Sequence, residues 1–211
     1  MRSKQIIPLF PLKIVLFPEM PLPLHIFEEK YKSMLRECIR TRKPFGLIFD
    51  DGKRISKVGC LANILKITQK YEDGRFDILV KGGKRFETIR IIDSKPYLKA
   101  EIKFLKEDPG YNSYEVEQLA SEALELFIDI MRSVNLKNES ILEEELSAEN
   151  ISFILPSSGI FPPEIGQKYL EIRSTKERLG LEIKQLQQIK HKLKEVENLE
   201  QAIRWRGFIL N

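Results

Sequence analysis

The chain has 211 residues, of which 42% are hydrophobic and 31% are charged, a composition typical of one large globular domain or two small ones. Its 35 basic residues are nearly balanced by 31 acidic ones, so the net charge of +4 is weak evidence for a nucleic-acid or anionic-membrane partner. Two cysteines supply neither a disulfide framework nor a four-ligand zinc set, and no apolar run is long enough for a secretion signal or a membrane span. We therefore expect a cytoplasmic protein with no membrane partner.

The first forty residues combine a proline-rich segment with an amphipathic helix. Five prolines between residues 8 and 23 interrupt short apolar runs, and proline confines such a segment to edge strands or extended coil. From Phe27 the period changes to that of a helix, which Pro44 ends. The predicted buried stripe consists of Phe27, Tyr31, Met34, Leu35, Cys38 and Ile39.

Residues 45–105 show a period of two, which predicts several short antiparallel strands. The pairs Asp51-Gly52, Asp73-Gly74 and Gly82-Gly83 supply the positive φ that tight hairpins require. Residues 98–104 alternate apolar and charged side chains, which predicts a strand with one buried and one solvated face. We expect a compact β sheet or pseudo-barrel.

The second half of the chain has the period of helices. A polar segment at 106–112 separates the halves and predicts subdomains at 1–107 and 113–211. Helices are predicted at 114–134, at 148–155 before Pro156, and from Pro163. A capping box at residues 174–177 begins the final long helix. Its apolar seam consists of Leu179, Ile183, Leu186, Ile189, Leu193, Val196, Leu199 and Ile203.

Several ordered motifs closely resemble one known family. They are PLFPL at 8–12, IVLFP at 14–18, PLHIFE at 23–28, FGLIF at 45–49, VGCLANI at 58–64, EDGRFDILVKGGKRF at 72–86 and KPYLKAEI at 95–102. Together they resemble the amino-terminal, substrate-binding domain of the ATP-dependent protease Lon, and EIGQKYLEIRSTKERLG at 164–180 resembles that family's helical part more loosely. The chain departs from the family pattern at Glu19, where glycine is usual, and at Glu29, where proline is frequent.

The resemblance implies an α+β fold. A PUA-like β pseudo-barrel with the Phe27 helix packed against it would precede an α-helical bundle subdomain with a long final helix. It also implies a stand-alone substrate-recognition domain without the ATPase and peptidase modules of the complete protease.

Motifs for catalysis and cofactors are absent from the sequence. There is no G-x-x-x-x-G-K-[ST] nucleotide motif, no H-E-x-x-H zinc motif and no G-x-S-x-G nucleophile motif. Of the two histidines, His25 lies in PLHIFE and is interpreted as structural, and His191 lies on a charged helix face. We therefore predict a non-enzyme with no catalytic residue, no cofactor and no metal.

The resemblance implies that the chain binds unfolded or specific polypeptides. Such binding requires exposed apolar side chains or a free strand edge. The candidate peptide-binding residues are Phe17 and Met20 in the proline-rich segment and Ile160 and Phe161 in SSGIFPP. The alternative interpretation of each is packing in the core or at a hinge.

Two further functions stay open on the sequence. RNA binding is one, because PUA-like barrels include nucleic-acid readers and basic residues cluster, although interleaved acids make nucleic acid the weaker partner. These clusters are Arg36, Arg40, Arg42 and Lys43; Lys53, Arg54 and Lys57; and Lys81, Lys84 and Arg85. The other is a scaffold that forms a homo-oligomer through the final helix, unless that seam packs on the helix at 114–134.

Overall fold

The structure is a computed structural model that describes residues 5–108, 113–134 and 146–209, with side chains up to residue 198. It contains six strands and five helices, an α+β protein as predicted. The elements are β1 (Gln5–Leu12), β2 (Pro21–Ile26), α1 (Glu29–Thr41), β3 (Phe45–Asp50), β4 (Ile55–Lys70), β5 (Phe76–Ile92), β6 (Lys99–Phe104), α2 (Ser113–Ser133), α3 (Ala148–Ser157), α4 (Pro163–Glu171) and α5 (Thr175–Ile209).

Two compact units divide the chain. The first unit comprises residues 1–108 and 153–173, and the second comprises residues 109–152 and 174–211. Helix α4 and the second half of α3 thus belong to the unit that contains the strands, although α2 precedes them in the sequence. The division into units is not collinear with the chain.

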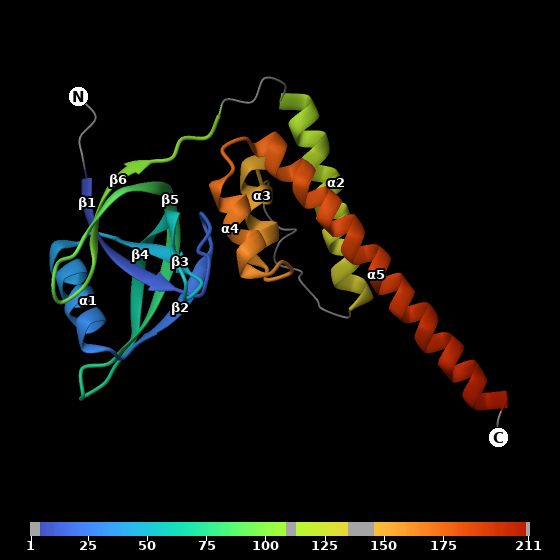
Figure 1. The fold of residues 1–211 in the computed structure, drawn as a ribbon, viewed down its shortest axis with the longest axis horizontal. Helices are drawn as coiled ribbons and strands as arrows, with labels where there is room; N and C mark the ends of the chain where they lie inside the picture. The colour runs from blue at the N-terminus through green and yellow to red at the C-terminus, as the bar shows by residue number, and fades with distance from the viewer. Residues whose placement is uncertain (1–4, 109–112, 135–145, 210–211) are drawn as a thin grey trace. The chain divides into compact units, whose positions relative to one another are not determined.

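The strands of the first unit form a mixed sheet of order β2-β5-β4-β3-β1-β6, and β5 also pairs with β6, so that the sheet closes on itself (Figure 1). Strand β5 has 17 residues, long enough to pair in turn with β2, β4 and β6. Strand β1 is parallel to β3 through Leu9–Leu12 and antiparallel to β6 through Gln5–Pro8. The prediction of an edge position for the prolines is correct for β2, which pairs with β5 alone. Strand β1 as a whole lies between β3 and β6, but Pro8 pairs only with β6 and Pro11 only with β3.

The barrel core is filled from the strands and from α1. Buried Met34, Leu35 and Cys38 of α1 contact a cluster that includes Phe45 and Val80. Phe27 was predicted to share this stripe but is 59% exposed, and α1 begins only at Glu29. The reason is that Phe27 continues the alternation of β2, in which Ile26 points inward and its successor outward.

The turn before β2 keeps its shape without the glycine that the family pattern has there. Glu19 adopts a left-handed φ of 64°, its N–H donates to the Gly82 carbonyl at 3.0 Å, and its carboxylate pairs with Lys81. These contacts hold a conformation that normally favours glycine.

Gly82-Gly83 is not a hairpin turn, contrary to the prediction, because both residues lie inside β5. Gly52 and Gly74 do occupy turns, with φ of 85° and 81°. Gly82 is required instead for close approach: a Cβ atom there would overlap the carbonyl oxygen of Phe17. Strand β5 passes the proline-rich segment at backbone contact distance, and the N–H of Gly82 donates to the Met20 carbonyl at 2.9 Å.

Replacing Gly82 with alanine is expected to destabilise the protein by about 1–3 kcal/mol, since the added methyl group meets backbone that cannot move aside. Urea denaturation followed by circular dichroism measures the loss. The matched control is Gly83→Ala, whose Cβ would meet the end of the Asn63 side chain at 2.5 Å, which can swing away, and Leu61 at the ordinary contact distances of 3.4 and 3.5 Å. Equal losses for the two variants would contradict the explanation.

The second unit is built on two long helices that pack along each other, α2 and α5 (Figure 1). Helix α5 begins as predicted, because Ser174 Oγ accepts the N–H of Glu177 at 3.2 Å. Within its apolar seam Leu179, Ile183 and Leu186 are buried and Val196 is exposed. The seam residues Leu199 and Ile203 lie outside the described side chains.

Helix α3 extends further than its proline predicts. The sequence predicts an end at Leu155, but the helix continues through Pro156 to Ser157. Proline removes only its own N–H donor, and the Ser158 N–H still donates to the Leu155 carbonyl at 3.3 Å. The helix therefore ends just after the proline rather than before it.

Candidate functional site

Two of the four predicted peptide-binding residues lie in the proline-rich segment, at different depths. The Phe17 ring is only 2% exposed, its centroid is 6.5 Å from that of Phe153, and it also lies against Gly166 of α4. Met20 is half-buried and packs against the barrel core. Phe17 therefore joins the strands to α3 and α4 within the first unit.

The other two lie in the connector between α3 and α4. Phe161 is buried, with its ring edge-on to Tyr169 of α4 at 5.2 Å, and Ile160 is half-buried. The two phenylalanines thus both pack on α4, in the arrangement that the alternative interpretation of core packing predicts. Peptide contact by these four residues stays a prediction.

Arg85 of β5, which the sequence groups with exposed basic residues, is buried. Its guanidinium donates to the carbonyl oxygens of Leu170 at 2.7 Å and Ile172 at 2.5 Å, pairs with Glu107, and lies 5.0 Å from the Phe153 ring. These contacts fix the carboxyl end of α4 on the barrel. Arg85 is therefore unavailable to the phosphates of a nucleic acid.

His25 has a carboxylate partner that its sequence neighbours do not reveal. The register of β2 and β5 places it opposite Asp77, with Nδ1 and Oδ1 2.5 Å apart, and Tyr71 donates to the other carboxylate oxygen at 2.7 Å. The hydrogen bond from His25, followed by that from Tyr71, lowers the pKa of Asp77. His25 and Asp77 are 52 positions apart, so their contact can be predicted only from the pairing of β2 with β5.

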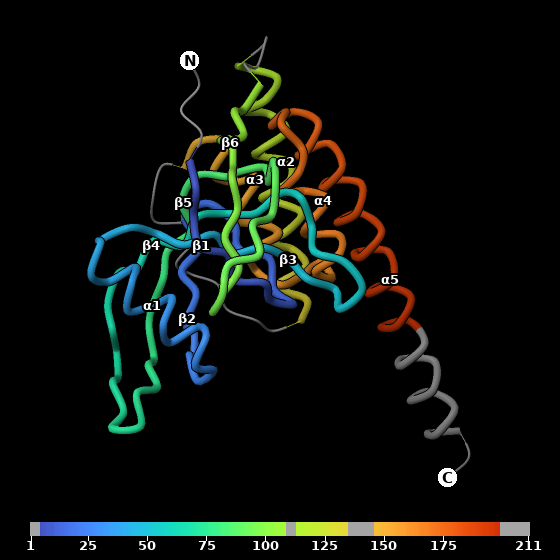
Figure 2. Tube along the Cα trace, turned by 60° about the vertical axis from the view of Figure 1, so that its left-hand side comes forward, coloured from blue at the N-terminus to red at the C-terminus, as the bar shows by residue number. Residues whose placement is uncertain are grey.

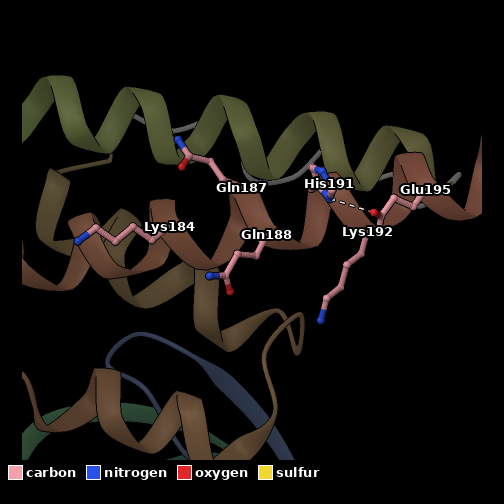
Figure 3. A pocket seen from close by; sticks show the side chains of 6 residues that line it. All are labelled: Lys184, Gln187, Gln188, His191, Lys192 and Glu195. Carbon is pink, nitrogen blue, oxygen red and sulfur yellow. Dashed lines mark ion pairs between the residues drawn. The ribbon is translucent and has the colours of Figure 1, made fainter.

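Helix α5 carries a surface hollow lined by Lys184, Gln187, Gln188, His191, Lys192 and Glu195 (Figure 3). All six side chains belong to the exposed face of one helix, and His191 Nδ1 lies 3.7 Å from the Glu195 carboxylate. This is the i,i+4 spacing of an ordinary surface pair. The solvated position predicted for His191 agrees with this geometry.

The other chemistry-bearing groups are isolated. Cys38 and Cys60 are free and buried, and burial raises the pKa of these thiols to about 11 and about 12. Among the described residues no three His, Cys, Asp or Glu side chains gather where they could hold a metal ion. No helix in the described ranges is long and apolar enough to cross a bilayer.

A groove of about 380 Å³ lies between the carboxyl end of α1 and the distal part of β4. We call it the edge groove. Residues Asn63–Ile67 of β4 line one side, and Ile39, Arg42 and Lys43 at the end of α1 line the other. Consecutive strand residues point to opposite faces, so a groove lined by all of them runs along the edge of the strand.

The groove exists because β4 extends beyond the end of its neighbour β3. Strand β3 pairs with β4 up to Ala62, and beyond it residues 63–70 pair with β5 on one side only. The hairpin of β4 and β5 extends beyond the end of β3 and lies at the lower left of Figure 2, and Lys32 of α1 donates to the Asp73 carbonyl at its tip. No sequence motif marks the groove, because it depends on the unequal lengths of paired strands.

Comparison with known proteins gives weak sequence identity over most of the chain. The chain is 24% identical to a Lon protease of Anaeromyxobacter dehalogenans, with 94% of this chain and 25% of that protein covered. It is 28% identical to a Lon protease of Flavobacterium johnsoniae, with 82% and 22% covered. The chain thus spans about a quarter of the length of these relatives.

Solved structures show the same fold. A Lon N-terminal domain protein from Xanthomonas campestris has a TM-score of 0.65 at 21% identity, covering 84% of this chain and 96% of that one. The N-terminal domain of a Mycobacterium avium complex Lon protease has a TM-score of 0.68 at 14% identity, covering 87% and 98%. The family model for the substrate-binding domain of the ATP-dependent protease La (LON) matches residues 6–188. The chain belongs to this Lon substrate-binding domain family.

Proposed function

We propose that the chain is a non-catalytic module that binds unfolded or specific polypeptides. The observation that carries the proposal is the match of residues 6–188 to a substrate-binding domain, joined to an edge groove with exposed apolar side chains. Exposed apolar surface on a rigid frame is what recognition of an unfolded chain requires.

Two observations support a role without catalysis. The matched part of the relatives is the quarter that corresponds to substrate binding. The thiols with raised pKa values are poor nucleophiles, because the thiolate is the reactive form. The free cysteines also support the proposal of a cytoplasmic protein.

RNA binding has less support than polypeptide binding. One of its predicted basic residues, Arg85, is buried, and Lys81 is paired with Glu19. Association of two copies through α5 stays a proposal, in which Val196 is the exposed seam residue within the described part of the helix.

We expect the full chain, immobilised, to retain an unfolded casein at low and high salt, while a folded globular protein of similar size passes through. Apolar contacts account for salt-resistant retention, whereas phosphate contacts weaken steeply as salt rises. The measurement is the fraction retained at 50 mM and 500 mM salt, with a single-stranded RNA in parallel. Retention of RNA but not casein, or cleavage of the casein, would overturn the proposal.

A further inference from the structure

The edge groove combines three features: a strand edge and positive charges that have no partner among the described residues, and exposed apolar side chains. We propose that it binds a short extended polypeptide segment in which apolar side chains alternate with acidic ones, added as a further strand along β4. This inference rests on the proposed function and names the segment that the module recognises.

The backbone of β4 beyond Ala62 is available for pairing. Residues 63–70 form their ladder with β5, and among the described residues no second strand pairs with their other side. Backbone N–H and C=O groups at such an edge are a template for another strand. A segment bound there would gain main-chain hydrogen bonds irrespective of its sequence, so that its side chains alone decide the preference.

The apolar part of the recognition comes from both walls. Leu65 and Ile67 of β4 are 55% and 42% exposed, and Ile39 across the groove is 37% exposed. Leu65 is the extra residue of a bulge, because Ile64 pairs with Val80 and Lys66 already pairs with Leu79. A bulge re-aims side chains and shortens the regular ladder, so the groove suits a segment of a few residues rather than a long strand.

The charge of the groove selects an acidic partner. Arg42, Lys43 and Lys66 line it, and its lining contains no aspartate or glutamate. No carboxylate of the described residues forms an ion pair with these three side chains. Carboxylates on a bound segment would supply the missing partners, whereas lysines on it would be repelled.

The test uses two soluble, fluorescently labelled ten-residue peptides, one with valine alternating with glutamate and one with lysine in place of glutamate. Fluorescence anisotropy with the full chain is expected to show the acidic peptide binding at least about 10-fold more tightly, a difference of about 1.4 kcal/mol. Two further versions of the acidic peptide carry N-methyl groups on every second backbone amide, one at the odd positions and one at the even positions. Only one of the two should lose binding, since only one set of N–H groups faces β4. Equal binding of the two peptides overturns the proposal.

Two matched pairs of variants locate the binding. Leu65→Ser with Ile67→Ser should weaken binding of the acidic peptide at least about 10-fold, since both side chains lose the apolar area that a bound segment would bury. The control is Ile89→Ser with Ile91→Ser on β5, which are 53% and 44% exposed and lie outside the groove. Lys43→Glu with Lys66→Glu should reverse the preference between peptides, and Lys53→Glu with Lys57→Glu should leave it unchanged. Equal effects of a variant and its control overturn the proposal.

Casein capture separates this inference from the function on which it rests. If the Leu65→Ser, Ile67→Ser variant retains casein as well as the unaltered chain does, polypeptide binding lies elsewhere. That result would overturn the inference about the edge groove but not the proposed function. Failure of the unaltered chain to retain casein would overturn the proposed function. Single-stranded RNA is tested as a competitor of the acidic peptide. If the RNA competes, and if the Lys43→Glu, Lys66→Glu variant no longer binds it, the groove is a nucleic-acid site and the inference is overturned.

Discussion

Replacing Arg85 with alanine is expected to destabilise the first unit by about 3–5 kcal/mol, the cost of breaking a buried, hydrogen-bonded ion pair. The truncation leaves the carbonyl oxygens of Leu170 and Ile172 without this donor and deprives Glu107 of its guanidinium partner. The Phe153 ring also loses the cation beside it. Urea denaturation followed by far-ultraviolet circular dichroism measures the change.

Two further variants make the Arg85 prediction specific. Arg85→Lys should recover only part of the stability, because an ammonium group lacks the planar fork that reaches two carbonyls and a carboxylate together. Arg54→Ala removes an exposed arginine 3.7 Å from Asp51 and should change the free energy of unfolding by less than about 0.5 kcal/mol. A loss for Arg85→Ala no larger than that for Arg54→Ala would contradict the role assigned to Arg85.

The second unit is expected to lose stability as the pH rises from about 4.5 to about 9, because of Glu182. Its side chain is fully buried on α5, and neither carboxylate oxygen has a hydrogen-bond partner among the described residues. Burial raises the pKa of Glu182 from 4.5 to about 9, and the positive charge of Arg178 opposes the rise only in part. The folded protein therefore keeps a proton that the unfolded chain releases.

The sign follows from this difference in bound protons. Below pH 4.5 both states hold the proton and stability is at its full value. Between the two pKa values the free energy of unfolding falls by up to about 1.4 kcal/mol per pH unit, and above the folded pKa the loss is complete. Urea denaturation at pH values from 5 to 9, followed by the helical circular dichroism signal, measures the slope.

Glu182→Gln should remove this slope and leave the second unit more stable than the unaltered protein at pH 8, since an amide of the same shape carries no titrating proton. Glu197→Gln, an exposed position on the same helix, should keep the slope of the unaltered protein. Parallel pH profiles for Glu182→Gln and the unaltered chain would show that another group is responsible.

The edge groove and the Arg85 contacts are parts of the molecule that sequence patterns did not predict. Periodicity records whether a side chain faces a core, but not whether a neighbouring strand is long enough to cover its edge. Arg85 was grouped with surface bases because charged residues are rarely buried, and its partners are 22 to 87 positions away. The prediction that Phe27 is buried on the first helix is wrong for a local reason, since the alternation of β2 continues through Phe27 and the helix begins only at Glu29.

The sequence by itself determined the α+β class, the family resemblance, the change from strands to helices near residue 107, and the cap at Ser174, because these depend on local periodicity, turn chemistry and ordered motifs. Tertiary structure alone decided that Gly82 serves close packing, that Phe17 and Phe161 are buried against α4, and that residues 153–173 join the barrel unit. Those features depend on contacts between segments far apart in the chain, whose distances no local pattern encodes.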